Sequence, residues 1–370
     1  MGYIALAAGG TAGHVNPALA LAEELVKRGH TVRFYGTTHG MEGQLVRDAG
    51  IDFCGLDVSG FDRARPHTAV QSILKITHAR DQLLKEFGDQ GVPDAAVGFG
   101  AYVEMPLAWA VAHCHKPLVL HEQNSVPGMA NKLMAHNAAI IALTYPSTET
   151  FFAKHAQRNA RIVVCGNPVR ASVLAPRREE SRKELGIDEK ECMLMIFGGS
   201  LGAQHINEAV ARLKQNLLER PNLVVLHATG RRDYERALES LQLTPQEEVR
   251  WRVLPYIDNM GTCLAAADCV VSRAGASSIA ELAARCVPSL LVPYPYATAD
   301  HQTTNARYLV DAGGARVISD DRLDGEEFDQ EVFELVDNSE LRAQMYEGLK
   351  TLGASEAAAR LADAVESTLL

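Results

Sequence analysis

Glycine and polar residues follow two short apolar runs of the chain, in a pattern suited to diphosphate chemistry. Residues 9–14 follow the run 4–8, and residues 272–281 follow the run 268–271. A strand that ends in glycine and opens a helix presents free backbone N–H groups at the positive end of the helix dipole, which suits a diphosphate. His14 lies at the mouth of the first loop. Its ordinary pKa of ~6.5 suits it to accept a proton from a hydroxyl group at neutral pH.

The second of these segments allows two interpretations. Gly275 permits a tight turn, and Ser277 or Ser278 is expected to cap a helix. Glu281 would then lie in the first turn of that helix, where ribose hydroxyls could reach it. Alternatively, Ser278 and Glu281 form a capping box, in which the glutamate serves only its own helix. The segment alone does not separate a ligand contact from a helix cap.

The elements that must position these residues repeat along the chain. A strand at 4–8, a helix at 17–28 and a strand at 31–35 form a β-α-β unit. The pattern restarts with a strand at 193–197 and a helix at 204–218, and a further strand is expected at 253–256, before Ile257. This repetition predicts an α/β protein with two doubly wound, Rossmann-like domains facing across a cleft. In such sheets, ligands bind beyond the carboxyl ends of the strands.

Two further strand ends of the first half are polar or rich in glycine. Residues 98–102 follow a strand at 95–97, and the sequence His-Glu-Gln-Asn at 121–124 follows a strand at 118–120. These ends are expected to share one cleft with the N-terminal loop. That loop lacks the G-x-G-x-x-G spacing, and the second strand ends in Gly36 rather than in an acid that would bind the ribose of NAD. An NAD-dependent dehydrogenase is therefore disfavoured.

The composition is that of a globular chain. Its 370 residues are 47% hydrophobic, which is enough for two domains. No apolar run reaches the ~18 residues of a membrane span, and the first residues lack the basic start of a secretory signal. Seven cysteines without a C-x-x-C pair favour a reducing cytoplasm and disfavour a disulfide framework or a zinc site.

Charge is distributed unevenly. The net charge is −10, yet residues 1–167 contain 14 Lys+Arg and 14 Asp+Glu, against 22 and 32 in the remainder. The neutral first half is therefore the better candidate to approach an anionic surface. Within it, residues 61–87 place basic side chains beside apolar ones at helical spacing. The basic ones are Arg63, Arg65, Lys75, Arg80 and Lys85. Such a helix could rest on a bilayer surface, or it could be an ordinary amphipathic helix that packs on the core.

Several motifs occur in an order that resembles one known family. They lie at residues 9–17, 98–103, 121–131, 166–170, 198–203, 256–260 and 272–305. His-Glu-Gln-Asn, Gly-Asn-Pro-Val-Arg and Asp-His-Gln-Thr are specific in combination. On these motifs the chain resembles the MurG family of bacterial peptidoglycan glycosyltransferases, which are GT-B enzymes of family 28. The resemblance implies inverting transfer of N-acetylglucosamine from UDP-GlcNAc to the C4 hydroxyl of MurNAc in undecaprenyl-diphospho-MurNAc-pentapeptide (lipid I), giving lipid II.

The resemblance also implies the site. His14 would be the general base for the acceptor hydroxyl. The implied donor contacts are Thr11, Ala12 and Gly13 at the sugar and diphosphate, Asn124 near the sugar, Arg170 and Ser200 at the diphosphate, Ile257 at the uracil, Ala276, Ser277, Ser278, Ile279, Ala280 and Glu281 at the uridine, and Gln302 at hydroxyls of the transferred sugar. Within this set, Glu281 would bind the ribose.

By the same resemblance, residues 1–167 form an acceptor and membrane-facing domain, and residues 168–349 form the UDP-sugar donor domain. A C-terminal helix at about 350–370 is expected to pack back on the first. The implied partners are UDP-GlcNAc, lipid I, the inner face of the cytoplasmic membrane, where the protein would be peripheral, and other cell-wall and division proteins. No nucleic acid is expected. The chain lacks an Asp-x-Asp triplet, so no metal or other cofactor is predicted, and helix N-termini with Arg170 would stabilise the leaving UDP.

Four residues depart from the commoner forms of the family: Ala12, Ala101, Leu201 and Glu104. Ala12 requires a negative φ, and Glu104 puts an acid in the loop expected to face the acceptor. Two other functions stay open. One is a different GT-B enzyme, such as a diacylglycerol glycosyltransferase or a UDP-sugar epimerase. The other is a non-catalytic subunit that binds UDP-sugar or acts as a membrane scaffold.

Overall fold

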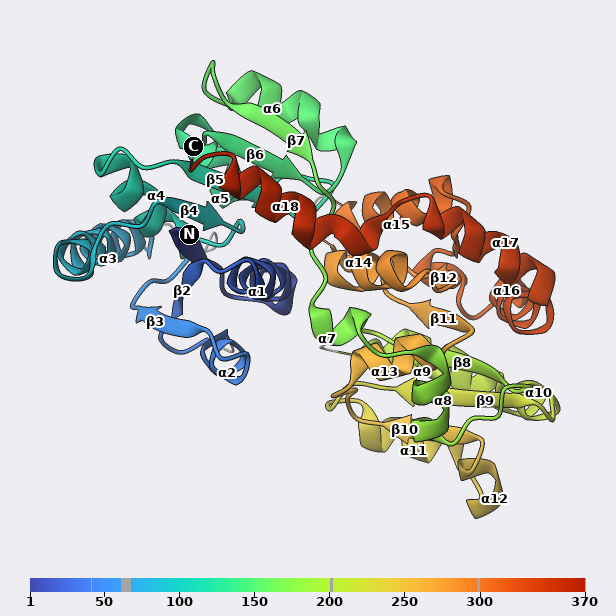
Figure 1. Ribbon diagram of the computed structural model, residues 1–370. Coiled ribbons are helices and arrows are strands. Elements are labelled where there is room, and N and C mark those ends of the chain that lie inside the picture. Colours follow the sequence, from blue (N-terminus) through green and yellow to red (C-terminus); the bar gives the residue numbers. More distant parts are fainter. Residues whose placement is uncertain (41, 61–67, 200–201, 298–299, 370) are drawn as a thin grey trace. The chain divides into compact units, whose positions relative to one another are not determined.

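The computed structural model describes residues 1–40, 42–60, 68–199, 202–297 and 300–369. The chain divides into two compact units, which are Met1–Arg170 with Glu356–Leu370, and Ala171–Ser355 (Figure 1). Each unit is built on a parallel sheet with helices packed on it. The predicted α/β class with two Rossmann-like domains is therefore confirmed.

The sheet of the first unit contains, in the described part of the chain, seven strands in the order β3-β2-β1-β4-β5-β6-β7. They are β1 (Tyr3–Ala7), β2 (Thr31–Thr37), β3 (Asp52–Leu56), β4 (Ala95–Gly98), β5 (Leu118–Glu122), β6 (Ile140–Leu143) and β7 (Arg161–Val164). The helices are α1 (Ala12–Lys27), α2 (Glu42–Asp48), α3 (Thr68–Gln90), α4 (Glu104–His113), α5 (Met129–Met134), α6 (Glu149–His155) and α18 (Ala357–Glu366). All strand pairs are parallel, so the carboxyl ends of β1, β4 and β5 share one edge of the sheet.

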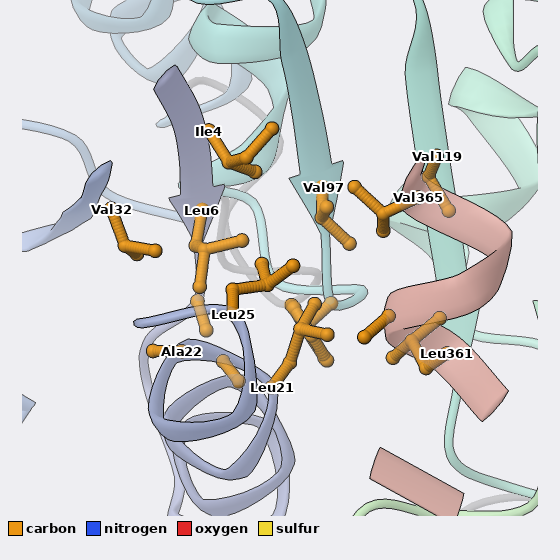
Figure 2. Close-up of a cluster of buried hydrophobic side chains, with 14 of the residues drawn as sticks. Ile4, Leu6, Leu21, Ala22, Leu25, Val32, Val97, Val119, Leu361 and Val365 are labelled. Carbon is orange, nitrogen blue, oxygen red and sulfur yellow. The ribbon is translucent and has the colours of Figure 1, made fainter. Parts of the chain in front are cut away.

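Two apolar layers cover this sheet because its strands are buried on both faces. Ile4 and Leu6 of β1 belong to a cluster that includes Leu21 of α1 and Leu361 of α18 (Figure 2). The intervening alanines of β1 belong to a second cluster, to which Leu83 of α3 and residues of α4 contribute. The last helix of the chain is therefore part of the core of the first unit.

Ion pairs add to this attachment of α18. Arg28, which follows α1, lies 2.6 Å from Asp363 and 2.8 Å from Glu366. His30 Nε2 lies 2.9 Å from the other carboxyl oxygen of Glu366. These partly exposed pairs contribute modestly beside the apolar contacts.

The second unit contains, among the described residues, six parallel strands in the order β10-β9-β8-β11-β12-β13. They are β8 (Cys192–Phe197), β9 (Leu223–Ala228), β10 (Trp251–Leu254), β11 (Cys269–Ser272), β12 (Ser289–Leu291) and β13 (Ala315–Val317). The helices are α7 (Ala171–Leu174), α8 (Arg178–Leu185), α9 (Gln204–Arg212), α10 (Lys214–Leu218), α11 (Tyr234–Leu241), α12 (Pro245–Glu248), α13 (Met260–Ala266), α14 (Ala276–Arg285), α15 (His301–Asp311), α16 (Glu326–Asp337) and α17 (Ser339–Lys350). Ile196, Val210, Trp251 and Phe328 anchor its core.

Several predicted boundaries are wrong, and strands β2 and β5 extend two residues past their predicted ends. Helix α1 begins at Ala12 rather than at Pro17, because the backbone N–H groups of residues 14 and 15 already bond to Thr11 and close a turn before the proline. The helix predicted at 204–218 is interrupted at Leu213, whose N–H bonds only three residues back. Strand β10 begins at the fully buried Trp251, two residues before the predicted start.

None of the described helices combines the length and hydropathy that a bilayer span requires.

Candidate functional site

Three strand ends of the first unit meet around Gly100, which follows β4. This glycine has φ +86°, and a Cβ built on it would lie 3.1 Å from Asn131 Nδ2 and 3.6 Å from Gln123 Oε1. The same Cβ would lie 3.6 Å from Cδ2 of His14 in α1. The β1–α1 turn, the β4–α4 turn and the segment after β5 therefore lie side by side, as predicted from the sequence for a shared site.

His14 lies in the first turn of α1 and is half-buried. Its Nδ1 lies 3.0 Å from Oγ1 of Thr11, the exposed N-cap residue of the helix. Burial lowers the pKa of His14 below its ordinary 6.5, because the charged ring loses hydration. The ring is therefore mostly neutral at pH 7 and able to accept a proton. Ala12 and Gly13 complete the turn, and Ala12 has the negative φ that its side chain requires.

The end of β5 is organised by the buried carboxylate of Glu122. It accepts hydrogen bonds from the backbone N–H of Asn124 at 3.0 Å, from the N–H of Gly128 at 2.8 Å and from Asn131 Nδ2 at 2.9 Å. Burial raises the pKa of Glu122, and these bonds oppose the rise. Asn124, a predicted sugar contact, is held here through its backbone. Glu122 and Asn131 were not predicted as site residues, although both belong to the family motif at 121–131.

Arg170, a predicted diphosphate contact, has its own partner within the first unit. Its Nε and Nη2 each lie 3.0 Å from Oε1 of Glu23 in α1. The nearby Gly166 carbonyl accepts from Nε2 of His121 at 3.0 Å. Burial lowers the pKa of His121 to about 4, so this ring is neutral. The diphosphate role of Arg170 stays a prediction.

The glycine loop after β8 is pinned by close backbone contacts. A Cβ on Gly198 would lie 2.3 Å from Ala203 N, and one on Gly202 would lie 2.4 Å from the Thr229 carbonyl at the end of β9. Only glycine fits either position. Ser200, the predicted diphosphate contact in this loop, lies outside the described residues, as does Leu201.

The turn between β11 and α14 differs from its prediction. Gly275 is the N-cap of α14, and no side chain caps this helix, so neither Ser277 nor Ser278 is a cap. Glu281 lies in the second turn rather than the first, and the capping-box alternative is also wrong. The helix starts at Ala276 because the extended backbone of Gly275 ends the strand segment two residues earlier than a serine cap would.

Among the described residues, two side chains at this turn have no hydrogen-bond partner, and a ligand could supply one. Oγ of Ser277 is buried and makes no hydrogen bond among the described residues. Glu281 is half-buried, and loss of hydration raises its pKa to about 7. Ile279 and Ala280 face the core, so their backbone alone could contact uridine. A hydroxyl and a weak acid at a helix N-terminus suit a diphosphate with an attached ribose.

Gln302 in α15 is oriented by the same turn. Its Oε1 accepts the backbone N–H of Ala274 at 3.2 Å and that of Tyr294 at 3.0 Å. With Oε1 occupied twice, the Nε2 group is the part of the amide left for a ligand. That group can only donate, which suits the oxygens of sugar hydroxyls.

The predicted uracil contact, Ile257, follows β10 and is 6% exposed. Its neighbour Tyr256 is 42% exposed, and the Arg231 guanidinium lies 5.2 Å from the Tyr256 ring centre. This segment thus presents an aromatic face beside a mostly buried isoleucine. A base could stack on it, and its contact with uracil stays a prediction.

Two Rossmann-like units in one chain, each with glycine turns at the carboxyl edge of a parallel sheet, place the protein in the GT-B class. Comparison with known proteins agrees with this class. Residues 4–143 match the glycosyltransferase family 28 N-terminal domain, and residues 193–361 match the glycosyltransferase family 28 C-terminal domain. The chain belongs to glycosyltransferase family 28.

Relatives cover nearly the whole chain. A UDP-N-acetylglucosamine–N-acetylmuramyl-(pentapeptide) pyrophosphoryl-undecaprenol N-acetylglucosamine transferase of Halothermothrix orenii is 37% identical, over 97% of both chains. The enzyme of that name from Bacillus subtilis is 34% identical, over 98% of both. Among solved structures, Acinetobacter baumannii MurG superposes with a TM-score of 0.74 at 27% identity, covering 99% of this chain and 100% of that one. The predicted family is therefore confirmed.

Proposed function

We propose that the protein transfers N-acetylglucosamine from UDP-GlcNAc to the C4 hydroxyl of MurNAc in lipid I, forming lipid II. The observation that carries this proposal is 37% identity over 97% of the chain to a relative that is named for this transfer. Both domains of family 28 are matched, so the resemblance includes the proposed acceptor and donor parts.

In the proposed reaction, Nε2 of His14 accepts the proton of the C4 hydroxyl while that oxygen attacks C1 of the donor sugar. The bond from C1 to the diphosphate oxygen breaks, and UDP leaves with the bonding electrons. Attack from the opposite side inverts the α-linked donor to a β-1,4 product. The half-buried position and lowered pKa of His14 support this role, because a neutral ring is needed to accept the proton.

We assign donor binding to residues 168–349 and acceptor binding to residues 1–167. The N-terminus of α14, the unpartnered hydroxyl of Ser277 and Nε2 of Gln302 support the first assignment. Helix N-termini stabilise the negative charge that develops on departing UDP. Arg170 is expected to add to this effect once its pairing with Glu23 is exchanged for the diphosphate.

The test is incubation with UDP-GlcNAc and a short-chain lipid I analogue, which should give UDP and the β-1,4 disaccharide lipid. His14→Ala is expected to lower turnover by about 10²–10⁴-fold while UDP-GlcNAc still binds. Two results would favour another GT-B enzyme: glycosylation of diacylglycerol instead of lipid I, or epimerisation of UDP-GlcNAc without acceptor. Unchanged cellular function in the His14→Ala variant would favour a non-catalytic subunit.

We also propose that the protein is peripheral at the inner face of the cytoplasmic membrane, through α3. Val70, Ile73 and Leu74 are 63%, 57% and 64% exposed, and Lys75 lies beside them. Large exposed apolar side chains next to a cation suit the boundary of an anionic bilayer. Arg63 and Arg65, predicted to contribute, lie outside the described residues.

Sedimentation with vesicles that contain an anionic lipid tests this surface. Ile73→Ser combined with Leu74→Ser is expected to weaken vesicle binding at least about fivefold, because each serine removes apolar area that the bilayer would bury. Val249→Ser is the matched control, since Val249 is 66% exposed in the other unit. An equal loss of vesicle binding in the Val249→Ser control, or no loss in the α3 variant, would contradict the proposal.

A further inference from the structure

Glu104 is a buried acid at the start of α4, and its side chain turns back toward the preceding loop. The residue is 1% exposed, and its Oε2 accepts the backbone N–H of Gly100 at 2.6 Å. The sequence places this acid in a loop expected to face the acceptor. The structure instead puts the carboxyl group behind the loop, where it can act on loop geometry but cannot touch substrate.

Gly98 and Gly100 shape the loop around this carboxyl group. A Cβ on Gly98 would lie 2.5 Å from Oε2 of Glu104, so glycine is what leaves room for the acid. Gly100 has φ +86°, and its Cβ position would lie 3.6 Å from Cδ2 of His14. The β4–α4 turn thus lies between the Glu104 carboxyl group and the His14 ring.

The other carboxyl oxygen, Oε1, is buried and has no hydrogen-bond partner among the described residues. Burial raises the pKa of Glu104 to about 8, the Gly100 N–H opposes the rise, and the charge of Glu122 adds to it. At neutral pH the acid is therefore mostly protonated. Oε2 can accept from Gly100 while Oε1 holds the proton.

Other ionisable groups lie near this part of the unit. They are Glu122 and His121 on β5, His14 on α1, and Glu42 on α2, whose Oε1 would lie 2.6 Å from a Cβ on Gly9. Burial lowers the pKa of His121 to about 4, so this ring is neutral, and burial also keeps the pKa of His14 below its ordinary value. None of these groups supplies a cation that would favour an ionised Glu104.

We infer that Glu104 is a positioning residue, whose hydrogen-bonded carboxyl group clamps the β4–α4 turn and thereby fixes the place of the His14 ring. This inference rests on the proposed transfer reaction, in which His14 must meet the acceptor hydroxyl. The Gly100 N–H bonds to the carboxyl group and the same residue approaches the His14 ring, so a change at Glu104 reaches the ring through the turn.

Three variants test the role. Glu104→Gln keeps an acceptor oxygen for the Gly100 N–H, so its kcat should stay within about twofold of wild type. Glu104→Ala removes the clamp, and kcat should fall about 10- to 100-fold, as expected for a small misplacement of a catalytic group. The KM for UDP-GlcNAc should stay unchanged. Glu149→Gln, at the exposed start of α6, is the control.

Wild-type kcat in a folded Glu104→Ala variant would overturn the inference. If the alanine variant does not fold, Glu104→Gln decides, because a fall in kcat of more than about tenfold despite the retained acceptor oxygen would also overturn it. The ¹⁵N signals of the His14 ring give a second readout that needs no acceptor. They should shift in Glu104→Ala and stay near wild type in Glu149→Gln, and this result separates failure of the clamp from failure of the proposed transfer.

Discussion

Thr11 Oγ1 lies 3.0 Å from Nδ1 of His14, so the N-cap of α1 holds the ring of the proposed base. A proton on Nδ1, donated to the threonine oxygen, leaves the lone pair of Nε2 free. The contact can therefore maintain the tautomer that a base at Nε2 requires. In this way a residue predicted to bind the donor also orients the residue predicted to activate the acceptor.

Replacing Thr11 with valine tests this contact, because valine keeps the shape and removes the hydroxyl. We expect kcat to fall about tenfold, since a positioned base contributes about 10²–10⁴-fold and only its orientation is affected. Thr11→Ser should retain most activity. Steady-state kinetics with the lipid I analogue would measure both, and a valine variant with wild-type kcat would remove the threonine from the mechanism.

Gln302→Glu distinguishes the role of the amide oxygen of Gln302 from that of its Nε2 group. A carboxylate can still accept the N–H groups of Ala274 and Tyr294, but it has no Nε2 donor for a sugar hydroxyl. We expect the fold to persist and UDP-GlcNAc binding to weaken about tenfold, as for the loss of one hydrogen bond of ~1.4 kcal/mol. Calorimetric titration measures the change. UDP alone is the control ligand, and its affinity should change less because it lacks the sugar.

The strands were predictable because they are short apolar runs that end in glycine or polar residues. The runs at 4–8 and 193–197 therefore fall within one residue of β1 and β8. The sequence did not predict which side chains near the end of a strand face inward. The sequence placed Glu104 in a loop expected to face the acceptor and did not single out Glu122. Only the folded chain shows that backbone N–H groups hold both acids in buried positions.

The residues at which helices begin were also difficult to predict from the sequence. Ser277, Ser278 and Gly275 are all acceptable N-caps by residue type, so pattern alone favoured the serines. The backbone decided otherwise, since Gly275 has the extended conformation of an N-cap. One consequence is that the Ser277 hydroxyl has no partner within the described part of the chain, whereas a capping role would have used it.

Donor binding should depend on pH through Glu281. Its pKa is raised to about 7 by burial, so the acid is mostly neutral at pH 6 and mostly ionised at pH 8. If the carboxylate accepts ribose hydroxyls, UDP-GlcNAc affinity should rise across this range in wild type and stay flat in Glu281→Gln. The free energy of unfolding should change in the opposite direction. An acid whose pKa is raised in the folded state stabilises that state at low pH, and this contribution is lost as the pH rises through 7. A flat wild-type binding profile would argue against the ribose contact.

The last helix should stabilise the first unit chiefly through Leu361, which is fully buried against α1 (Figure 2). Leu361→Ala leaves a cavity beside Leu21, and such truncations cost about 2–5 kcal/mol of the free energy of unfolding. Denaturant unfolding followed by a probe in the first unit measures the loss. Glu356→Ala, at the exposed N-cap of the same helix, is the control and should cost less than about 1 kcal/mol. Equal stability of the two variants would indicate that α18 is held chiefly by the ion pairs of Arg28 and the hydrogen bond of His30, and in that case stability should fall with added salt.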